Sequence, residues 1–197
     1  MPQIKKLNRL LPLVAIGTIA DCQSIIEPTN RLLVKAGLSI LQKSSHNIIG
    51  LNELIDQTGL KAKIAQGYEL NSMDLGFTLS PILNSSGRIS HARLSITTLI
   101  TNNRLTNQVN LVKENEPFFN QPAKELASNL IQTNQDRKLM VKDILEEVET
   151  EAQKQFDSGA KMLWLEGNWN KGIIGLLASR LVNQYDIPVV VVSVGHE

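Results

Sequence analysis

The chain has 197 residues, of which 42% are hydrophobic and 20% are charged, and both fractions are ordinary for a globular protein with a sizeable core. Its formal net charge of +1 does not argue for nucleic-acid binding, so any such site must come from the local placement of Arg and Lys. A single cysteine excludes an internal disulfide, and no apolar run reaches the roughly 18 residues that span a bilayer, so we expect a cytoplasmic protein with no membrane partner.

The first elements are predicted to be a strand followed by short helices. Residues 11–19 form a short apolar run rich in branched side chains, which favours a buried parallel strand. The spacing of apolar residues predicts one or two short helices over 29–42, broken near Gly37, and another helix over 47–59 that ends at Gly59. Residues 60–71 combine alternating and helical features, and their pattern does not decide between the two.

The middle of the chain is predicted to pass from an extended segment through loops and a helix. Residues 77–83 are apolar, contain Pro81 near their end, and lead into a predicted loop over 84–88. Residues 92–100 return to a helical period. Residues 101–121 are polar and rich in Asn, which predicts a surface loop or a mobile insertion.

A long helix and a βαβ unit are predicted for the last third of the chain. No Gly or Pro occurs between Ala123 and Asp157, and a narrow apolar stripe runs along this charged stretch. We therefore expect one long helix, or two nearly continuous ones, that link two domains. A strand over 161–165, a helix over 172–184 and a strand over 188–194 follow, and this order predicts parallel strands joined by a right-handed crossover.

Asp21 is a candidate metal ligand because it lies just past the predicted strand at 11–19. Ligands of open α/β sheets bind beyond the carboxyl ends of the strands. Carboxylate oxygens are the ligands that Mg²⁺ and Mn²⁺ prefer. The alternative is that Asp21 caps the helix or turn that follows, as Asp residues at strand ends often do.

Asn84, Gly87 and Arg88 are candidate phosphate-binding residues in the predicted loop of sequence NSSGR. Small residues let backbone N–H groups approach a ligand closely, and the planar guanidinium of Arg88 suits a phosphate group. The alternative is an ordinary turn with a solvated arginine.

Gly172, Gly175 and Ser179 are candidate anion-binding residues beside Arg180. On the predicted helix they lie three or four residues apart on one nearly bare face, which lets another chain or a phosphate approach the backbone. The N–H groups of the first turn and the helix dipole both favour an anion there. The alternative is that these small residues let the helix pack tightly on the sheet.

Five segments of the chain, taken together, carry a resemblance to a known family. In chain order they are 13–21 (LVAIGTIAD), Asn30 and Arg31 with Leu33, Val34, Gly37 and Leu38, 80–88 (SPILNSSGR), Asn134 with Arg137 and Lys138, and 172–182 (GIIGLLASRLV) with Tyr185 and Pro188. In this order and at this spacing they resemble the RecJ branch of the DHH phosphoesterase superfamily. The resemblance covers nearly the whole chain.

The resemblance implies an α/β fold in three parts. These are the C-terminal part of a parallel-sheet DHH catalytic domain over 1–100, a loop and long linker helix over 101–157, and the start of a smaller α/β DHHA1 domain over 158–197. It also implies a single-stranded-DNA-specific 5′→3′ exonuclease of DNA repair and recombination. In that family, two Mn²⁺ or Mg²⁺ ions activate a water for attack on the phosphodiester of single-stranded DNA held between the two domains.

The resemblance also implies roles for individual residues. Asp21 aligns with the last metal-ligating and catalytic Asp of the DHH domain, and Arg88 aligns with the Arg that helps hold the 5′ end of the DNA. Ser179 and Arg180 align with the DHHA1 helix that faces the same pocket. Asn170 stands where the family usually has His.

The chain departs from the family at both ends. The DxDG-type motif, an intermediate Asp and the Asp-His-His triplet belong upstream of Leu11, and a Gly/Ser/Arg-rich DHHA1 motif belongs after the last residue. We therefore expect a fragment that is inactive alone and that works with a complementary N-terminal fragment. The alternatives are a DHH-family phosphoesterase acting on oligoribonucleotides or phosphoadenosine phosphate, and a non-catalytic module that binds single-stranded DNA.

Overall fold

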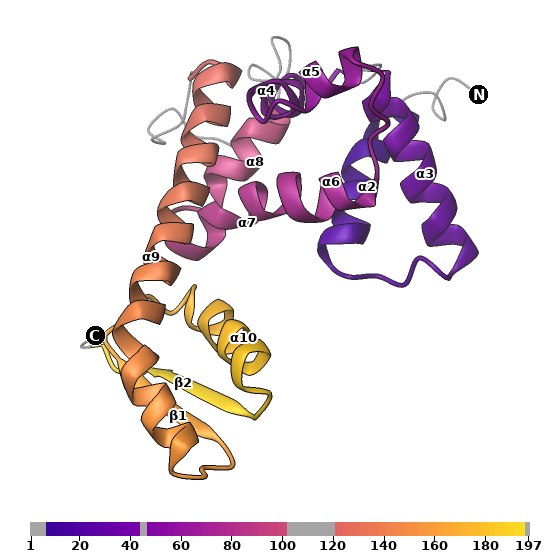
Figure 1. Ribbon diagram of the computed structural model, residues 1–197. Helices are drawn as coiled ribbons and strands as arrows, with labels where there is room; N and C mark the ends of the chain where they lie inside the picture. The colour runs from indigo at the N-terminus through magenta and orange to yellow at the C-terminus, as the bar shows by residue number, and fades with distance from the viewer. Residues whose placement is uncertain (1–6, 44–46, 102–120, 196–197) are drawn as a thin grey trace. The chain divides into compact units, whose positions relative to one another are not determined.

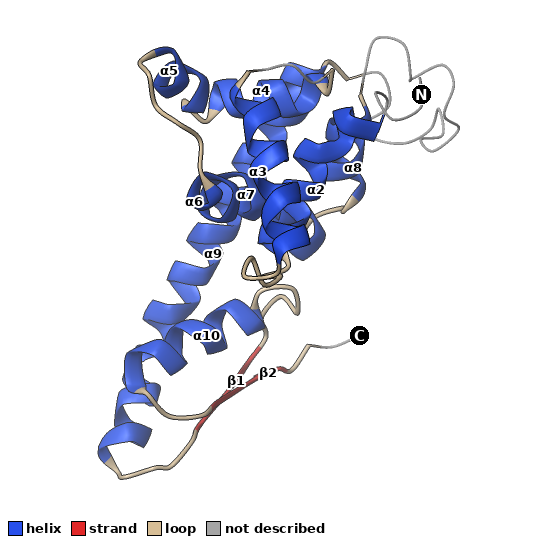
Figure 2. Cartoon of the chain, turned by 90° about the vertical axis from the view of Figure 1, so that its right-hand side faces the viewer, coloured by secondary structure: helices blue, strands red, loops and turns tan. Residues whose placement is uncertain are grey.

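The computed structural model describes residues 7–43, 47–101 and 121–195, which are mostly helical with one small parallel sheet (Figures 1 and 2). The chain divides into two compact units. The first contains the described residues up to Asn84 and those from Ala92 to Ile131, and the second contains Ser85–His91 and the described residues from Gln132 onward. Helices α7 (Ser80–Ile89) and α9 (Ala123–Asp157) have residues in both units.

The first unit is built from short helices. Besides parts of α7 and α9, its described elements are η1 (Asn8–Leu10), α2 (Leu11–Ala20), α3 (Pro28–Gln42), α4 (Ile49–Gln57), α5 (Leu60–Ala65), α6 (Ser72–Asp74), the π-helical turn η2 (Leu75–Leu79) and α8 (Arg93–Ile100). The helix predicted over 92–100 is confirmed by α8. None of the described helices is long and apolar enough to cross a bilayer.

The strand predicted over 11–19 is wrong, because these residues form helix α2. Pro12 stands in the first turn, where a helix tolerates proline, and the buried residues Pro12, Ala15 and Ile16 follow helical spacing. A short, continuous apolar run is compatible with a buried strand or a buried helix, and its period alone does not separate them. The parallel sheet expected for the first domain is likewise not seen, since the described residues of the first unit contain no strand.

The break predicted at Gly37 is also wrong, because α3 runs through it without interruption. A Cβ at Gly37 would overlap the carbonyl oxygen of Leu11 and the Cβ of Ala15, so glycine here allows α2 and α3 to pack closely. Gly59 is the helix stop that the sequence predicts: it follows α4 with a left-handed φ of 77°.

The extended segment predicted over 77–83 and the loop predicted over 84–88 are both helical, in η2 and α7. Pro81 is the second residue of α7, directly after a π-helical turn whose wider hydrogen-bond spacing suits a residue without an N–H. Ser85 and Ser86 are fully buried, so tertiary packing overrides the loop preference of their sequence.

The core of the first unit is one cluster of leucine and other apolar side chains from most of its helices. Its buried members are Ala15, Ile16, Leu41, Leu51, Leu54, Ile55, Leu60, Leu70, Leu75, Leu79, Ile82, Leu94, Leu126, Ala127 and Leu130. The last three come from the start of α9, which is therefore anchored in this unit.

The second unit has the predicted βαβ order. Strand β1 (Leu163–Gly167), helix α10 (Ile174–Tyr185) and strand β2 (Val189–Ser193) follow one another, and the strands pair in parallel from Leu163↔Val189 to Gly167↔Ser193 (Figure 1). The sequence prediction of two parallel strands around a helix is confirmed. The long helix predicted over 123–156 is confirmed as a single helix, α9.

The core of the second unit joins α9, α10 and the two strands. Its buried members are Val141, Ile144, Val148, Ala152, Leu163, Leu165, Trp169, Ile173, Leu177, Leu181 and Tyr185. The α9 members recur every three or four residues, so one stripe of that helix faces this core. The loop predicted over 101–121 lies outside the described residues, apart from its two end positions.

Candidate anion-binding site

The end of α7 and the turn before α10 are in direct contact within the second unit. A Cβ at Gly172 would overlap the carbonyl oxygen of Arg88, so only glycine allows this approach. The Nη1 of Arg88 donates a hydrogen bond to the carbonyl oxygen of Gly172 at 3.2 Å. Two segments predicted separately as phosphate-binding, 84–88 and 172–180, are therefore brought together at Arg88 and Gly172.

The turn that leads into α10 is fixed by Asn170. The backbone N–H of Gly172 donates to Asn170 Oδ1 at 2.8 Å, and that of Ile173 donates to the Asn170 carbonyl at 3.1 Å. The N-cap residue of α10 is Ile173, which has no side chain able to cap the helix. The first turn of α10 thus lacks the side-chain acceptor that many helices have, and its positive dipole end favours an anion.

The small residues of the 172–180 segment divide between the two roles that the sequence left open. The helix predicted over 172–184 begins after Gly172, which lies in the turn before α10. Gly172 is required for tight packing against Arg88, as argued above. Gly175 is exposed, and no atom lies within 4 Å of a Cβ built there, so its small size has no packing role among the described residues. Ser179 is exposed, and its hydroxyl donates to the Gly175 carbonyl at 3.0 Å. This face of α10 is open to a ligand.

Three guanidinium groups gather in the second unit, and we call Arg88, Arg137 and Arg180 the arginine cluster. Burial, followed by the positive charges of Arg88 and Arg180, lowers the pKa of Arg137 below its usual value. Arg88 and Arg137 are half-buried, whereas Arg180 is exposed. The ion pairs of the described residues, Lys61–Asp56 and Lys142–Glu146, include no member of the cluster. An anion would relieve the mutual repulsion of these charges.

Arg137 was not predicted as a site residue. The resemblance includes Asn134 and Arg137, but it assigned them no role. Their signal in the sequence is an asparagine and an arginine three residues apart on a long helix. Only the fold shows that the charges of Arg88 and Arg180 are close enough to lower the pKa of Arg137.

The other two predicted residues of the 84–88 segment lie on the surface of α7. Asn84 and Gly87 are both exposed, and Asn84 belongs to the first unit while Gly87 belongs to the second. Among the described interactions, neither residue hydrogen-bonds to Gly172 or packs against it as Arg88 does.

Asp21 lies at the end of a helix and not, as predicted, at the end of a strand. It is exposed, and its backbone N–H closes the last turn of α2 on the Gly17 carbonyl at 3.0 Å. The next helix, α3, is preceded by Glu27 at its N-cap, so Asp21 does not cap it.

The described residues do not fit a two-metal centre. Mg²⁺ and Mn²⁺ require several oxygen ligands in near-octahedral geometry. Within residues 7–43, 47–101 and 121–195, no three His, Cys, Asp or Glu side chains are grouped so that they could hold a metal ion. Asp21 therefore offers one carboxylate without the companions that such a centre needs.

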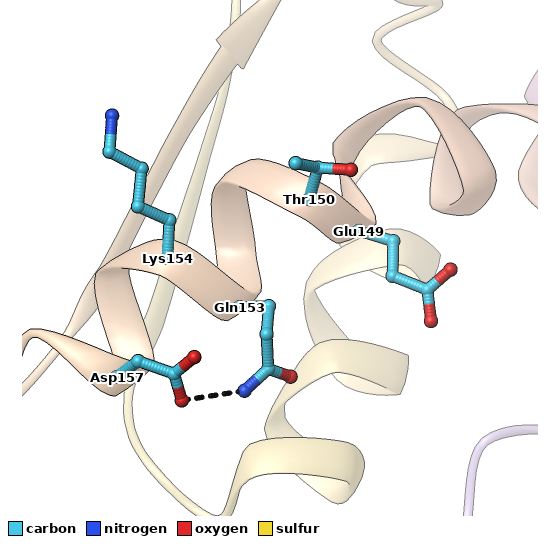
Figure 3. A pocket seen from close by; sticks show the side chains of 5 residues that line it. All are labelled: Glu149, Thr150, Gln153, Lys154 and Asp157. Carbon is cyan, nitrogen blue, oxygen red and sulfur yellow. Dashed lines mark hydrogen bonds between the residues drawn. The ribbon is translucent and has the colours of Figure 1, made fainter.

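A pocket in the second unit is lined by Glu149, Thr150, Gln153, Lys154 and Asp157, all from α9 (Figure 3). Gln153 donates a hydrogen bond to Asp157 at 2.8 Å across one turn of the helix. The pKa of the nearby Tyr185 is raised by burial and then by the negative charges of Glu149 and Asp157. The negative field at this end of α9 disfavours a phosphate, so the pocket is a poor nucleic-acid site.

Curated relatives identify the family. Over 191 residues, or 96% of its length, the chain is 34% identical to the single-stranded-DNA-specific exonuclease RecJ of Bacillus subtilis. The chain belongs to the RecJ family. It is also 29% identical to the RecJ of Haemophilus influenzae over 92% of its length, and 27% identical to that of Escherichia coli over 95%. The chain spans 21%, 28% and 29% of these three relatives, and no protein-family model matches it.

Solved RecJ structures share the fold. The RecJ of Thermus thermophilus in complex with Mg²⁺ has a TM-score of 0.70 at 24% identity, and the match covers 94% of this chain and 25% of that one. An exonuclease RecJ bound to manganese has a TM-score of 0.71 at 25% identity, covering 95% of this chain and 41% of that one. The helical first unit and the small parallel sheet are therefore features of the RecJ fold.

Proposed function

We propose that this chain supplies the surface of a single-stranded-DNA-specific 5′→3′ exonuclease that holds the 5′-terminal phosphate of the strand. The observation that carries the proposal is the contact between Arg88 and Gly172, because it joins the two segments that the sequence marks as phosphate-binding. The RecJ relationship supports single-stranded DNA as the ligand. The aromatic content of 4% is low for binding by base stacking, so recognition rests on the phosphates.

Each residue of the site has a distinct part in holding the phosphate. Arg88 keeps one guanidinium nitrogen on the Gly172 carbonyl, which fixes the orientation of the group and leaves its other donors for phosphate oxygens. Gly175 and Ser179 leave the face of α10 open, and Arg180 adds a positive charge beside it. Gly172 sets the close approach of α10 to Arg88. Gly87 provides exposed surface beside Arg88 in the second unit, and Asn84 is an exposed candidate contact of the first unit.

Hydrolysis requires groups beyond these residues. The resemblance to RecJ implies a pair of Mn²⁺ or Mg²⁺ ions, which would supply the activated water if a complete set of ligands held them. We assign Asp21 to such a centre as one metal ligand, and other residues must supply the remaining ligands. We therefore propose that the chain alone binds DNA without cutting it. Together with a complementary N-terminal segment it would form an active nuclease of DNA repair and recombination in the cytoplasm. In this proposal, residues 1–100 belong to the DHH domain, residues 101–157 form the loop and connecting helix, and residues 158–197 belong to the DHHA1 domain.

The test is the affinity of the purified chain for a fluorescent oligothymidylate of about ten nucleotides, a length within the usual site sizes for single strands. The same oligonucleotide is compared with a 5′-phosphate and with a 5′-hydroxyl. We expect tighter binding of the phosphorylated strand, and a loss of about tenfold or more for that strand in Arg88→Ala and Arg180→Ala. Equal affinity for the two ends, or unchanged affinity in both variants, would contradict the proposed function. Preference for a dinucleotide over the longer strand would favour a small-substrate phosphoesterase.

A further inference from the structure

Asn134 and Arg137 lie one turn apart on α9, within the part of that helix that belongs to the second unit. Residues three apart on a helix share a face. Asn134 is buried, with 6% of its surface exposed, and Arg137 is half-buried. Asn134 is the one buried polar residue among the described residues of α9, and the charged residues of that helix other than Arg137 are exposed, so the pair needs an explanation.

Both side chains carry a buried polar atom that has no partner. The Nε of Arg137 and the Oδ1 of Asn134 make no hydrogen bond to any other part of the chain that the structure describes. Such atoms are unfavourable in a protein interior and are rare in native structures, where they mark strain, a function or a missing ligand. One is a donor and the other an acceptor, so a hydrogen bond between them would satisfy both.

The surroundings of Arg137 are positive. Arg88 and Arg180 act on it from α7 and α10, and their charges, together with burial, lower its pKa. Three elements that are distant in the sequence thus bring three cations close together. None of the three arginines belongs to an ion pair with a carboxylate among the described residues. A structural core would not gather such a group, because like charges in a partly buried place repel one another.

We propose that Arg137 is a third phosphate-binding side chain of this site and that Asn134 is its positioning residue. The ligand class is a terminal phosphate monoester. When it binds, Arg137 turns its two terminal nitrogens to the phosphate oxygens, and its Nε donates to Asn134 Oδ1. No residue-level role of this kind was assigned to either side chain by the sequence. The inference rests on the proposed function, since it deepens the same site.

Charge balance makes this arginine a determinant of end specificity. A phosphate monoester carries about 1.5 to 2 negative charges at pH 7, whereas an internal phosphodiester carries about one. A third guanidinium is worth most to the ligand with the larger charge and the larger number of free oxygens. Arg137 therefore contributes more to binding a phosphorylated 5′ end than to binding the rest of a strand.

The experiment measures how strongly the chain prefers the 5′-phosphorylated oligothymidylate over its 5′-hydroxyl counterpart, in the full chain with EDTA present. Arg137→Gln should weaken binding of the phosphorylated strand by about tenfold to a hundredfold and change binding of the hydroxyl strand much less. Asn134→Ala should show the same selective loss at smaller size. Lys142→Ala is the matched control, because it removes one positive charge from α9 at an exposed residue paired with Glu146. It should leave the preference unchanged.

A second substitution keeps the proposal falsifiable if Arg137→Gln unfolds the chain. Asn134→Asp has nearly the same shape and places a carboxylate beside Arg137, so it should reduce the preference by neutralising one cation, while circular dichroism reports an intact fold. If Arg137→Gln and Asn134→Asp keep the full preference while Arg88→Ala loses it, the role of Arg137 is wrong and the proposed function stands. An equal loss for both strands also rules out the role. A wild-type chain without the preference contradicts the proposed function itself.

Discussion

The arginine cluster and the region around Asp21 differ in what surrounds their charges. In the arginine cluster, three cations from α7, α9 and α10 converge, and a glycine contact holds two of the elements together. Asp21 is a single exposed carboxylate at the end of α2, and no group of metal-ligating side chains forms among the described residues. On the proposed function, phosphate binding would use residues of this chain alone, whereas metal chemistry would need additional ligands, so experiments can separate the two.

The largest expected effect removes the contact that builds the arginine cluster. Gly172→Val places side-chain carbons where the Arg88 carbonyl lies. Forced overpacking typically costs about 1–3 kcal/mol or more, so the second unit should lose stability and phosphate-end binding together. Urea unfolding followed by circular dichroism, and the oligothymidylate assay, measure the two losses.

Gly175→Ala is the matched control for this substitution. No atom lies within 4 Å of its new Cβ, and alanine is the better helix former by about 1 kcal/mol. The free energy of unfolding should stay the same or rise. Equal destabilisation by the two substitutions would show that the Arg88–Gly172 contact is not what distinguishes these glycines.

Salt should weaken binding to the arginine cluster in proportion to its charge. Neutralising about three phosphate charges predicts a slope of about −2 in a plot of log affinity against log salt for a single strand. Between 50 and 200 mM salt this amounts to about a tenfold to twentyfold loss. Each arginine-to-glutamine change in the cluster should make the slope shallower by about 0.7. Slopes that stay the same in all three variants would place the DNA elsewhere on the chain.

The pH dependence should follow the phosphate and not the protein. A terminal phosphate gains its second negative charge as the pH rises through its pKa of about 6. A guanidinium group does not lose its proton in this pH range, so the charge of the protein at the cluster does not change. Affinity for the phosphorylated strand should therefore rise a few-fold between about pH 5 and 7 and then level off. The hydroxyl-ended strand has no such group, so a parallel rise for both strands would refute this account.

The smallest expected effect is at Asp21. If its role belongs to a metal centre that other residues must complete, Asp21→Asn should leave the affinity for the phosphorylated strand in EDTA within error of the wild type. The substitution removes one exposed negative charge and no described side-chain hydrogen bond. A marked loss of binding would mean that Asp21 acts in phosphate binding, and the separation drawn above would fail.

Parts of the fold were predictable where one pattern had one structural meaning. The charged stretch from Ala123 to Asp157 has helical spacing and no Gly or Pro, and it forms one helix. The β-branched run at 189–193 forms a strand in parallel with Leu163–Gly167. Residues 11–19 failed because a short apolar run fits a buried strand and a buried helix equally well. Residues 84–88 failed because burial of Ser85 and Ser86 outweighs their preference for loops.

The candidate site was predictable residue by residue but not as an arrangement. Arg88, Gly172 and Gly175 carry local signals, namely a guanidinium beside small residues and a bare helix face. Nothing local indicates that Gly172 packs on Arg88 while Gly175 stays open. The role proposed for Arg137 depends on three arginines from three different helices: Arg137 comes 49 residues after Arg88 (137 − 88) and 43 residues before Arg180 (180 − 137). Such convergence follows from tertiary structure alone.

The most direct test of the central claim is the affinity of the wild-type chain for the phosphorylated and hydroxyl-ended oligothymidylates, measured once with EDTA and once with Mn²⁺. The account predicts that the preference for the 5′-phosphate is already present with EDTA, because the arginine cluster provides it without a metal. A preference that appears only when Mn²⁺ is added would contradict the account, since phosphate binding would then depend on the metal centre.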